Sequence, residues 1–470
     1  MRIGAMAAAV GLAMVASASM AGGVQASRVV TAPAPEGVPM SSDYRVTVNG
    51  TPVAVYTAPV WYPTYVKPFG GPYAFASFDF AGAARVEIAT QRPLDRLQVL
   101  PESRGVRPAV RDGKVVLTLR RPCQLSIEPD GKNGPLLLFA NPLERDVPRP
   151  GAPGVRYFGP GVHRPGRIDL RDNETLYLAA GAVVHGGVVA RGRNIRILGR
   201  GILDGGVWER FKGPAPHPLQ FVECRDALVE GIVLKDSWSW TLVVTNSDGV
   251  RIRNVKICSS RCENNDGIDV VNSRNVRVSD CFIRSDDDCI APKGFGEQMG
   301  AEPWPPVEDF IVERTVLWTD RAHIWRLGCE SRASAMRRMV FRDIDVIHYT
   351  DPTCPAISVQ PAEDMLMEDV LFENVRIRHE GQALFLDLNP HPTPWAKKQT
   401  PGRIRNVVFR NVSLEGPPGS PPGRILISGA GETHPIENVT FDNVRRHGVK
   451  ATADAPEVVV QGAVRGVVWK

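Results

Sequence analysis

The sequence predicts an all-β protein in which a small β-sandwich domain precedes a right-handed parallel β-helix. Three observations lead to this prediction. A nine-residue unit with a fixed set of apolar positions recurs along the C-terminal two thirds of the chain. Short runs of alternating apolar and polar residues, separated by turns, fill the part before residue 150. The 44 glycines and 40 prolines of this 470-residue chain are typical of a protein rich in turns.

The composition describes a folded chain of more than one domain. Hydrophobic residues make up 43% of the sequence and charged residues 23%, which is typical of globular proteins and not of disordered ones. A chain of 470 residues is long enough for two or three structural units. The formal net charge of +5 is small, and the Lys and Arg residues are scattered singly. Nucleic acid is therefore not an expected partner.

The first 26 residues have the features of a signal peptide. An apolar, Ala-rich run at residues 5–18 follows a short positive start, and small residues place cleavage after Ala21 or Ala26. The apolar run is too short to span a bilayer and no later segment is long enough, so no membrane span is expected. We expect an exported protein, periplasmic or extracellular, with a flexible lead-in at residues 27–43.

The eight cysteines are an even number, and export would permit disulfide bonds. Cys258 with Cys262, or Cys281 with Cys289, could pair, and the spacing leaves both alternatives open. Cys281 occupies an inward strand position, which favours a small buried apolar side chain. The cysteines and histidines show no zinc-like spacing, so no metal and no cofactor are expected.

Residues 44–150 are predicted to form the β-sandwich domain. Six short alternating runs are separated by turns: YRVTVNG, ARVEIAT, LDRLQVL, KVVLTLRR, CQLSIEP and PLLLFAN. The Pro- and Gly-rich segment 145–154 is predicted to link this domain to the next. We place the domain boundary near residue 150.

Residues 151–470 are predicted to form the parallel β-helix. The nine-residue unit has apolar residues at its second, fourth, seventh and ninth positions and is often opened by Asn or Asp. Its copies are DALVEGIVL (226–234), GVRIRNVKI (249–257), NVRVSDCFI (275–283), DFIVERTVL (309–317), RMVFRDIDV (338–346), DVLFENVRI (369–377), NVVFRNVSL (406–414) and, with the last apolar position lost, NVTFDNVRR (438–446). The alternation predicts two short strands per unit, with a bend between them. Stacked coils then share one continuous core.

The spacing of the copies argues against a β-propeller. Propeller blades have about 40–50 residues with four strands each, whereas the copies here recur at shorter and uneven intervals. The longer inserts, at 292–306 and 378–403, are predicted to loop outward and to line a cleft. Residues 456–470 are predicted to form a final strand pair or cap.

Two acidic turns lie one coil apart in this pattern. Asp266 precedes Asp287 by 21 residues and Asp288 by 22. Adjacent coils are about 4.8 Å apart, so the two turns should bring these carboxylates onto one face. Two carboxyl groups that face each other across a bond can protonate a leaving oxygen and activate a water. A third carboxylate nearby raises the pKa of the acid by repulsion between like charges.

Two other interpretations of these turns stay open at this point. Asn and Asp ladders commonly satisfy the turn amides of β-solenoids without any catalytic role. Grouped carboxylates are also the ligands that calcium prefers.

The segment from Cys262 to Gly294 resembles a known enzyme family. NNDGID followed by SDDDCIA is similar to the N-T-D and D-D-C motifs of glycoside hydrolase family 28, the polygalacturonases. That family shares its pectin-lyase-like solenoid with the family 49 dextranases and isopullulanases. The resemblance covers about residues 155–445. It implies that Asp287 is the general acid and that Asp266 and Asp288 hold and activate the water. We interpret the adjacent Asp286 as a turn residue.

The departures from the family 28 pattern concern the histidine motif and the substrate. AHIWRLGC (322–329) keeps a histidine and a glycine in register, which favours a catalytic-site role for His323. The segment Pro355–Ser358 stands where the family has Arg-Ile-Lys, yet it contains neither Arg nor Lys. WTDRAHIWRLGCES followed by DIDVIH is more similar to family 49, which also carries an N-terminal β-sandwich. A neutral sugar polymer or oligosaccharide is therefore favoured over polygalacturonate.

Polar and aromatic residues near the acidic turns are candidates for substrate binding. Those that could bind sugar hydroxyls are Asn264, Lys293, Arg326, Glu330 and His348. Tryptophans stack well on the apolar faces of sugar rings. The candidates for such stacking are Trp238, Trp240, Trp318 and Trp325, and we predict that Trp238 and Trp325 bind the substrate. Some of these tryptophans must belong to the core. For the polar residues, a solvated or coil-stacking role is the alternative.

The sequence therefore predicts an exported glycoside hydrolase that acts with inversion on a polysaccharide or oligosaccharide. The first alternative is a polysaccharide lyase on the same kind of β-helix, which would need an acidic sugar, calcium and a basic proton acceptor. The second alternative is a non-catalytic carbohydrate-binding solenoid. Such a protein would not be expected to have acidic turns that align with the catalytic motifs of an enzyme family.

Overall fold

The computed structural model describes residues 27–61, 72–349, 351, 353–378 and 384–470. The predicted signal peptide, residues 1–26, lies outside the described residues. The part of the chain that the structure describes contains no helix whose length and hydropathy would let it span a bilayer.

The N-terminal part consists of two packed β-sheets. The first contains β1 (Arg28–Val30), β4 (Val55–Ala58), β5 (Tyr73–Ala81), β7 (Gln98–Leu100), β10 (Cys123–Lys132) and β11 (Leu136–Pro142). The second contains β2 (Tyr44–Val48), β3 (Thr51–Val53), β6 (Ala84–Thr90), β8 (Ala109–Arg111) and β9 (Lys114–Leu119), and the 3-10 turn η1 (Glu102–Arg104) lies between β7 and β8. Buried side chains from both sheets, such as Phe78, Leu117 and Leu125, form one core between them. This arrangement is a β-sandwich.

The predicted flexible lead-in at residues 27–43 is wrong. Strand β1 pairs antiparallel with β5, with Arg28 opposite Ala81, and Met40 bridges to Tyr56. The segment is ordered because its backbone groups complete the edge of the first sheet and Val29 packs against the sandwich core. The domain boundary near residue 150 stays a prediction.

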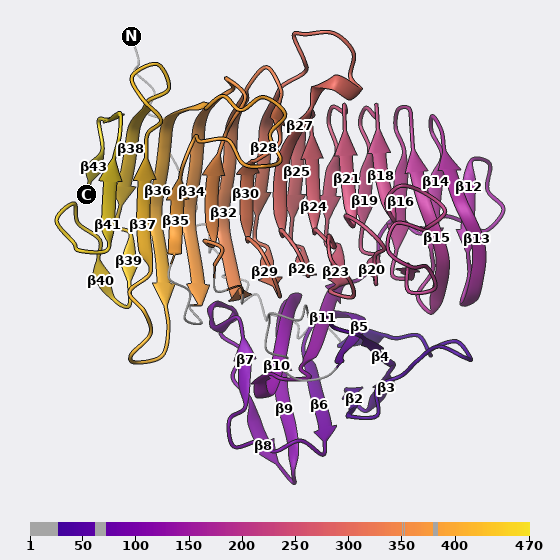
Figure 1. The fold of residues 1–470 in the computed structure, drawn as a ribbon. Coiled ribbons are helices and arrows are strands. Elements are labelled where there is room, and N and C mark those ends of the chain that lie inside the picture. The colour runs from indigo at the N-terminus through magenta and orange to yellow at the C-terminus, as the bar shows by residue number, and fades with distance from the viewer. Residues whose placement is uncertain (1–26, 62–71, 350, 352, 379–383) are drawn as a thin grey trace, which may run out of the picture.

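The described residues from Val155 onward form a parallel β-helix of 32 paired strands, seen in Figure 1 as one row running from magenta to yellow. Ladder 1 contains β12 (Val155–Phe158), β14 (Thr175–Leu178), β16 (Arg196–Gly199), β19 (Leu228–Glu230), β22 (Arg251–Arg253), β25 (Arg274–Ser279), β28 (Val307–Glu313), β32 (Met336–Tyr349), β34 (Leu366–Arg378), β36 (Arg403–Glu415), β38 (Ile436–Asp442), β42 (Val464–Arg465) and β43 (Val468–Trp469).

Two further ladders complete the coils. Ladder 2 contains β13 (Gly161–Leu170), β15 (Ala182–Ala190), β17 (Ile202–Asp204), β20 (Val233–Lys235), β23 (Lys256–Ser259), β26 (Phe282–Ser285) and β29 (Val316–Thr319), continues through the second halves of β32, β34 and β36, and ends at β39 (Arg445–Arg446) with β40 (Val449–Lys450). Ladder 3 contains β18 (Leu219–Val222), β21 (Leu242–Thr245), β24 (Ile268–Val271), β27 (Ile290–Phe295), β30 (Trp325–Gly328), β31 (Ser331–Arg332), β33 (Ile357–Gln360), β35 (Leu384–Leu388), β37 (Arg424–Ser428) and β41 (Val458–Gln461), and the 3-10 turn η2 (Gly296–Gln298) follows β27.

The nine-residue unit owes its polar positions to backbone geometry. Its first and sixth residues adopt left-handed φ angles, for example 53° and 57° at Asn275 and Asp280, and 55° and 52° at Asn406 and Asn411. Asn, Asp and Gly tolerate this region best, which explains why they open and bend most of the units. The asparagines also stack between coils, as where Asn411 Nδ2 donates to Asn374 Oδ1 at 3.1 Å.

The predicted fold class, a right-handed parallel β-helix after a small β-sandwich, is confirmed. One detail differs. Two short strands per unit are present in the first four units, whereas β32, β34 and β36 each run through the bend as one continuous strand. Neighbouring later coils stay paired on both sides of the bend, as Arg342 with Glu373 and Ile344 with Val375, so the ladder is not interrupted there.

The sandwich packs against the outer face of ladder 2, below the middle of the β-helix in Figure 1. Tyr73, Phe75 and Phe139 of the sandwich share an apolar cluster with Phe282 and Trp318 of the β-helix. Among the described residues, none of the eight cysteines is disulfide-bonded, so neither of the two possible pairings is present. The sandwich thus lies against β23, β26 and β29 on the outside of the β-helix.

Candidate active site

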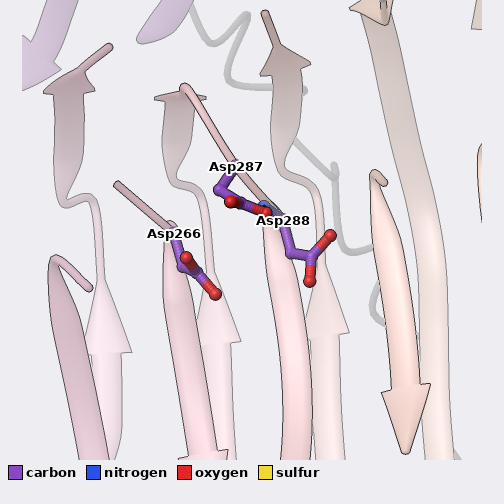
Figure 2. Close-up of side chains that lie close together, drawn as sticks. All are labelled: Asp266, Asp287 and Asp288. Atoms are coloured by element: carbon purple, nitrogen blue, oxygen red, sulfur yellow. The ribbon is translucent and has the colours of Figure 1, made fainter. Parts of the chain in front are cut away.

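Three aspartates meet where two neighbouring turns enter ladder 3 (Figure 2). Asp266 precedes β24, and Asp287 with Asp288 precedes β27. These strands are adjacent and parallel, with Ile268 opposite Ile290. One carboxylate oxygen from each of the three aspartates lies within 4.8 Å of the others. The geometry is the one expected from the coil spacing, and the catalytic roles of the three residues stay predictions.

Buried hydrogen bonds hold both turns in shape. Asn265 is fully buried, its Oδ1 accepts from the backbone N–H groups of Arg261 and Cys262, and its Nδ2 donates to the Ser237 carbonyl at 3.0 Å. In the second turn, Thr319 Oγ1 donates to the Asp287 carbonyl at 2.8 Å. Our sequence analysis missed the role of Asn265, although the Asn-Asn pair before Asp266 was visible.

Asp266 is paired with a buried lysine. Lys293 Nζ lies 2.9 Å from Asp266 Oδ2, 3.0 Å from Asp269 Oδ1 and 3.8 Å from the centroid of the Trp240 ring. Burial raises the pKa of Asp266 well above its usual range, and the Lys293 ammonium opposes that rise. Burial likewise raises the pKa of Asp269 to about 7. Asp269 was not among our candidates because it reads as an ordinary strand residue in the sequence.

Asp288 is paired with His323 from the following coil. Its Oδ1 accepts from His323 Nδ1 at 2.9 Å and from the His323 backbone N–H at 3.1 Å. Burial opposes protonation of His323, but the adjacent carboxylate outweighs it and raises the histidine pKa to about 9. In return, although burial disfavours the carboxylate, His323 holds the pKa of Asp288 below its usual range. Asp288 is therefore kept ionised, as activation of a water requires.

Asp287 is the most exposed of the three, with 14% of its side chain accessible against 3% for Asp266 and 5% for Asp288. Burial raises the pKa of Asp287, and the charge of Asp288 adds to that rise. Arg321 opposes it, since its Nη2 lies 2.5 Å from Asp287 Oδ2 and 3.1 Å from Asp286 Oδ2. Asp286, which we interpreted as a turn residue, thus also forms an ion pair with the arginine that contacts Asp287.

Replacing Arg321 by glutamine is expected to move the alkaline limb of the kcat/KM pH profile to higher pH by about one unit or more. A general acid is active when protonated, so the rate falls as pH rises through its pKa. Removal of the neighbouring cation raises the pKa of Asp287 and extends the active range upward. Arg338→Gln, in an exposed ion pair on ladder 1, is the matched control. An unchanged or lowered alkaline limb would contradict the assignment of Asp287 as the acid.

The structure brings some of the predicted binding residues to this face. Lys293 is in direct contact with the cluster. Arg326 is half-buried on β30, and its charge is among those that lower the pKa of Asp288. Glu330, half-buried just after β30, adds negative charge near Lys293. Asn264 lies at the rim, where its Oδ1 accepts from Arg210.

Three predicted binding residues cannot touch a sugar. Trp238 and Trp325 are fully buried, Trp238 beneath the loop that contains Ala215 and Trp325 in the β-helix core. His348 is buried on ladder 2, where its Nε2 pairs with Glu128 of the sandwich at 2.9 Å. Packing between coils and between domains uses these side chains, so these three predictions are wrong. Trp240, the stacking candidate from the same turn as Trp238, is only half-buried and lies beside Lys293.

The spacing of Asp266, Asp287 and Asp288 would also allow the three carboxylates to share a cation. Two of them already have basic partners, Lys293 on Asp266 and Arg321 on Asp287. These basic groups supply much of the positive charge that a metal would otherwise provide.

A protein-family model matches the segment that contains the acidic turns. The model for "Glycosyl hydrolases family 28" matches residues 188–299. A probable polygalacturonase of Vitis vinifera is 25% identical over 258 residues, 51% of this chain and 51% of its own length. A probable polygalacturonase of Arabidopsis thaliana is 35% identical over 89 residues, 19% of this chain and 20% of its own length. The chain thus spans about half the length, or less, of these two relatives.

Solved structures show the same fold over nearly the whole chain. Dex49A from Penicillium minioluteum superposes with a TM-score of 0.66 at 16% identity, covering 94% of this chain and 96% of its own. A family 28 exopolygalacturonase of Yersinia enterocolitica gives a TM-score of 0.50 at 15% identity, with the same coverage. At these identities the likeness shows the fold. Together with the family match, it confirms the resemblance to the family 28 and family 49-like β-helix superfamily.

Proposed function

We propose that this chain is a glycoside hydrolase that cleaves O-glycosidic bonds of a polysaccharide or oligosaccharide by general acid–base catalysis. One observation carries the proposal: Asp266, Asp287 and Asp288 present oxygens within 4.8 Å of one another on one face of the β-helix. The family 28 match over residues 188–299, which includes all three aspartates, supports a glycosidase.

The proposed roles follow from exposure and charge. Asp287, the most exposed carboxyl and one whose pKa is raised, protonates the leaving oxygen. Asp288, kept ionised by His323, accepts the proton of a water that Asp266 helps to hold. The water attacks the anomeric carbon in a single displacement, so the product emerges with inverted configuration.

The stereochemical outcome is a sharp test of these roles. Carboxyl groups of inverting enzymes are commonly about 6.5–9.5 Å apart, and those of retaining enzymes about 5–5.5 Å. The oxygens here approach more closely than the inverting range. Inversion therefore rests on the presence of a third carboxylate to hold the water and on the family resemblance. NMR of the first-formed product that showed retention would reject the single displacement.

We further propose that the substrate is a neutral glycan. Acidic groups outnumber basic ones around the cluster: Asp266, Asp269, Asp286, Asp287, Asp288, Glu330 and Asp387 stand against Lys293, Arg321, Arg326 and His323. Three of the four basic groups, Lys293, Arg321 and His323, already pair with an aspartate of the cluster, which leaves little positive charge to attract a polyanion such as polygalacturonate. The segment Pro355–Ser358, which lacks Arg and Lys, supports the same choice.

We also propose that the protein is exported, to the periplasm or beyond the cell. The proposal rests on the signal-peptide features of residues 1–26. N-terminal sequencing of the protein recovered outside the cytoplasm would test it, with a start after Ala21 or Ala26 as the expected result.

A panel of polysaccharides tests the function directly. The purified protein is incubated with neutral glucans, xylans and mannans and with polygalacturonate, and new reducing ends are measured. We expect release from at least one neutral polymer, and none from the same polymer with Asp287→Asn. Activity on polygalacturonate alone would overturn the neutral-substrate proposal. Absence of hydrolysis across the panel, with the binding experiments below positive, would favour the carbohydrate-binding alternative.

Activity is expected to survive removal of divalent metals. Acid–base hydrolysis by carboxylates requires no metal, and Lys293 and Arg321 already pair with two of the three aspartates. The measurement is the hydrolysis rate before and after dialysis against EDTA, with calcium added back in a parallel sample. A complete loss that calcium restores, with products that absorb as unsaturated uronates, would contradict hydrolysis and indicate a lyase.

A further inference from the structure

A cavity of about 530 Å³ adjoins the aspartate cluster on the side of the earlier coils. Its floor is formed by outward residues of ladder 3, Val243 and Thr245 of β21 and Val271 of β24. The remaining lining residues are Phe211, Pro216, His217, Ser239, Trp240, Asn264, Phe295 and Gln298. Lys293 connects the cavity to the cluster, because its ammonium lies against both the Trp240 ring and the Asp266 carboxylate.

Aromatic rings dominate one wall of this cavity. The His217 and Trp240 rings are parallel within 4°, with centroids 5.5 Å apart, and Phe295 lies 5.8 Å from Trp240 on another side. At the rim, Phe211 is 61% exposed and has a φ angle of 60°, a region in which a bulky residue is strained. Strained backbone conformations are concentrated at ligand-binding positions. A hydrogen bond from the Phe211 backbone N–H to the Trp238 carbonyl, at 2.8 Å, stabilises this conformation.

The charged groups around the cavity are already neutralised. Lys293 is held between Asp266 and Asp269, and Arg210 pairs with Glu263 at 2.7 Å. Burial lowers the pKa of His217 to about 4, with a further contribution from Lys293, so this ring is neutral above that pH. Among the described lining residues, the polar ones are Ser239, Thr245, Asn264, Gln298 and neutral His217. A carboxylate would find no uncompensated cation here, whereas hydroxyl groups would find several partners.

We propose that this cavity is a sugar-binding subsite that takes a neutral pyranose unit next to the bond positioned at the aspartate cluster. The sugar contacts the edge of the Trp240 ring, because the His217 ring and the Lys293 ammonium already lie over that ring. A pyranose has an apolar face suited to an aromatic ring and a rim of hydroxyls suited to uncharged polar side chains. The inference rests on the proposed function, and it specifies both the substrate class and the residue that selects it. Trp240 is here a specificity-determining residue.

The test measures binding separately from hydrolysis. The Asp287→Asn protein is titrated calorimetrically with malto-, isomalto-, cello-, xylo- and manno-oligosaccharides of two to six units and with trigalacturonate. We expect at least one neutral series to bind, and trigalacturonate to bind more weakly or not at all. Trp240→Ala in the same background should weaken binding of that series about tenfold, the equivalent of about 1.4 kcal/mol. Trp240→Phe, which keeps a ring, should recover most of the affinity.

The controls separate a failed subsite from a failed function. Circular dichroism and thermal unfolding check that each variant is folded, and Trp395→Ala, an exposed tryptophan outside the cavity lining, is the matched control. An unchanged dissociation constant in Trp240→Ala, tighter binding of trigalacturonate, or no binding of any neutral series would overturn the subsite. Binding as expected without turnover by the wild-type protein would leave the subsite standing and reject the hydrolase.

Discussion

Replacing Asp287 by asparagine is expected to lower kcat by about 10²–10⁴-fold on a confirmed substrate, with the fold intact. The substitution keeps the shape of the side chain and removes the proton that the leaving oxygen would receive. Asp287 is the most exposed of the three clustered carboxyls, and burial together with Asp288 raises its pKa, so it is the one best placed to donate. Initial rates at saturating substrate provide the measurement.

Companion variants show whether the loss belongs to the cluster. Asp266→Asn and Asp288→Asn should cause falls of similar size, because both remove a group that holds or activates the water. Asp309→Asn is the matched control: its left-handed φ angle of 55° suits asparagine, and its partner is an exposed arginine on ladder 1. A near-wild-type rate for Asp287→Asn would leave the acidic turns with the structural role of satisfying backbone amides.

Replacing Arg284 by methionine is expected to reduce the free energy of unfolding by about 3–5 kcal/mol. The Arg284 side chain is 1% exposed and its Nε lies 2.9 Å from Asp320, itself 2% exposed. Removal of the cation leaves a buried carboxylate without its main partner, which costs more than the pair contributes. The guanidinium also lies between the rings of Tyr73, at 4.1 Å, and Trp318, at 3.8 Å, so contact between the sandwich and the β-helix is lost as well.

Denaturant unfolding and the melting temperature measure this effect. Arg410→Met, which removes the two surface pairs of a 46% exposed arginine with Glu373 and Asp442, should change stability by less than about 1 kcal/mol. If Arg284→Met were as stable as the wild type, Asp320 would have to be neutral or re-paired, and the Arg284 bridge would not hold the two parts together. Because Asp320 precedes Arg321, we expect the variant to lose some activity too.

The regular architecture could be predicted because it repeats. Positions with left-handed φ angles, such as Asn275 and Asn406, accept few residue types. Asn, Asp or Gly therefore recurs at these positions, and the repeat can be recognised in the sequence. Apolar residues between them must face a shared core, which determines which side of each strand is inward. The spacing from Asp266 to Asp287 matches one coil, and parallel pairing of β24 with β27 then brings their side chains together.

The sequence by itself therefore determined the β-helix, the sandwich before it and the meeting of the three aspartates, since each follows from a local period. Only the tertiary structure decided which side chains surround the three aspartates. Trp238 and Trp240 share one turn, yet one is buried beneath a loop and the other lines a cavity, because side-chain direction in a turn has no period. Glu128 pairs with His348 across 220 residues of chain, and such a contact depends on how the two domains dock.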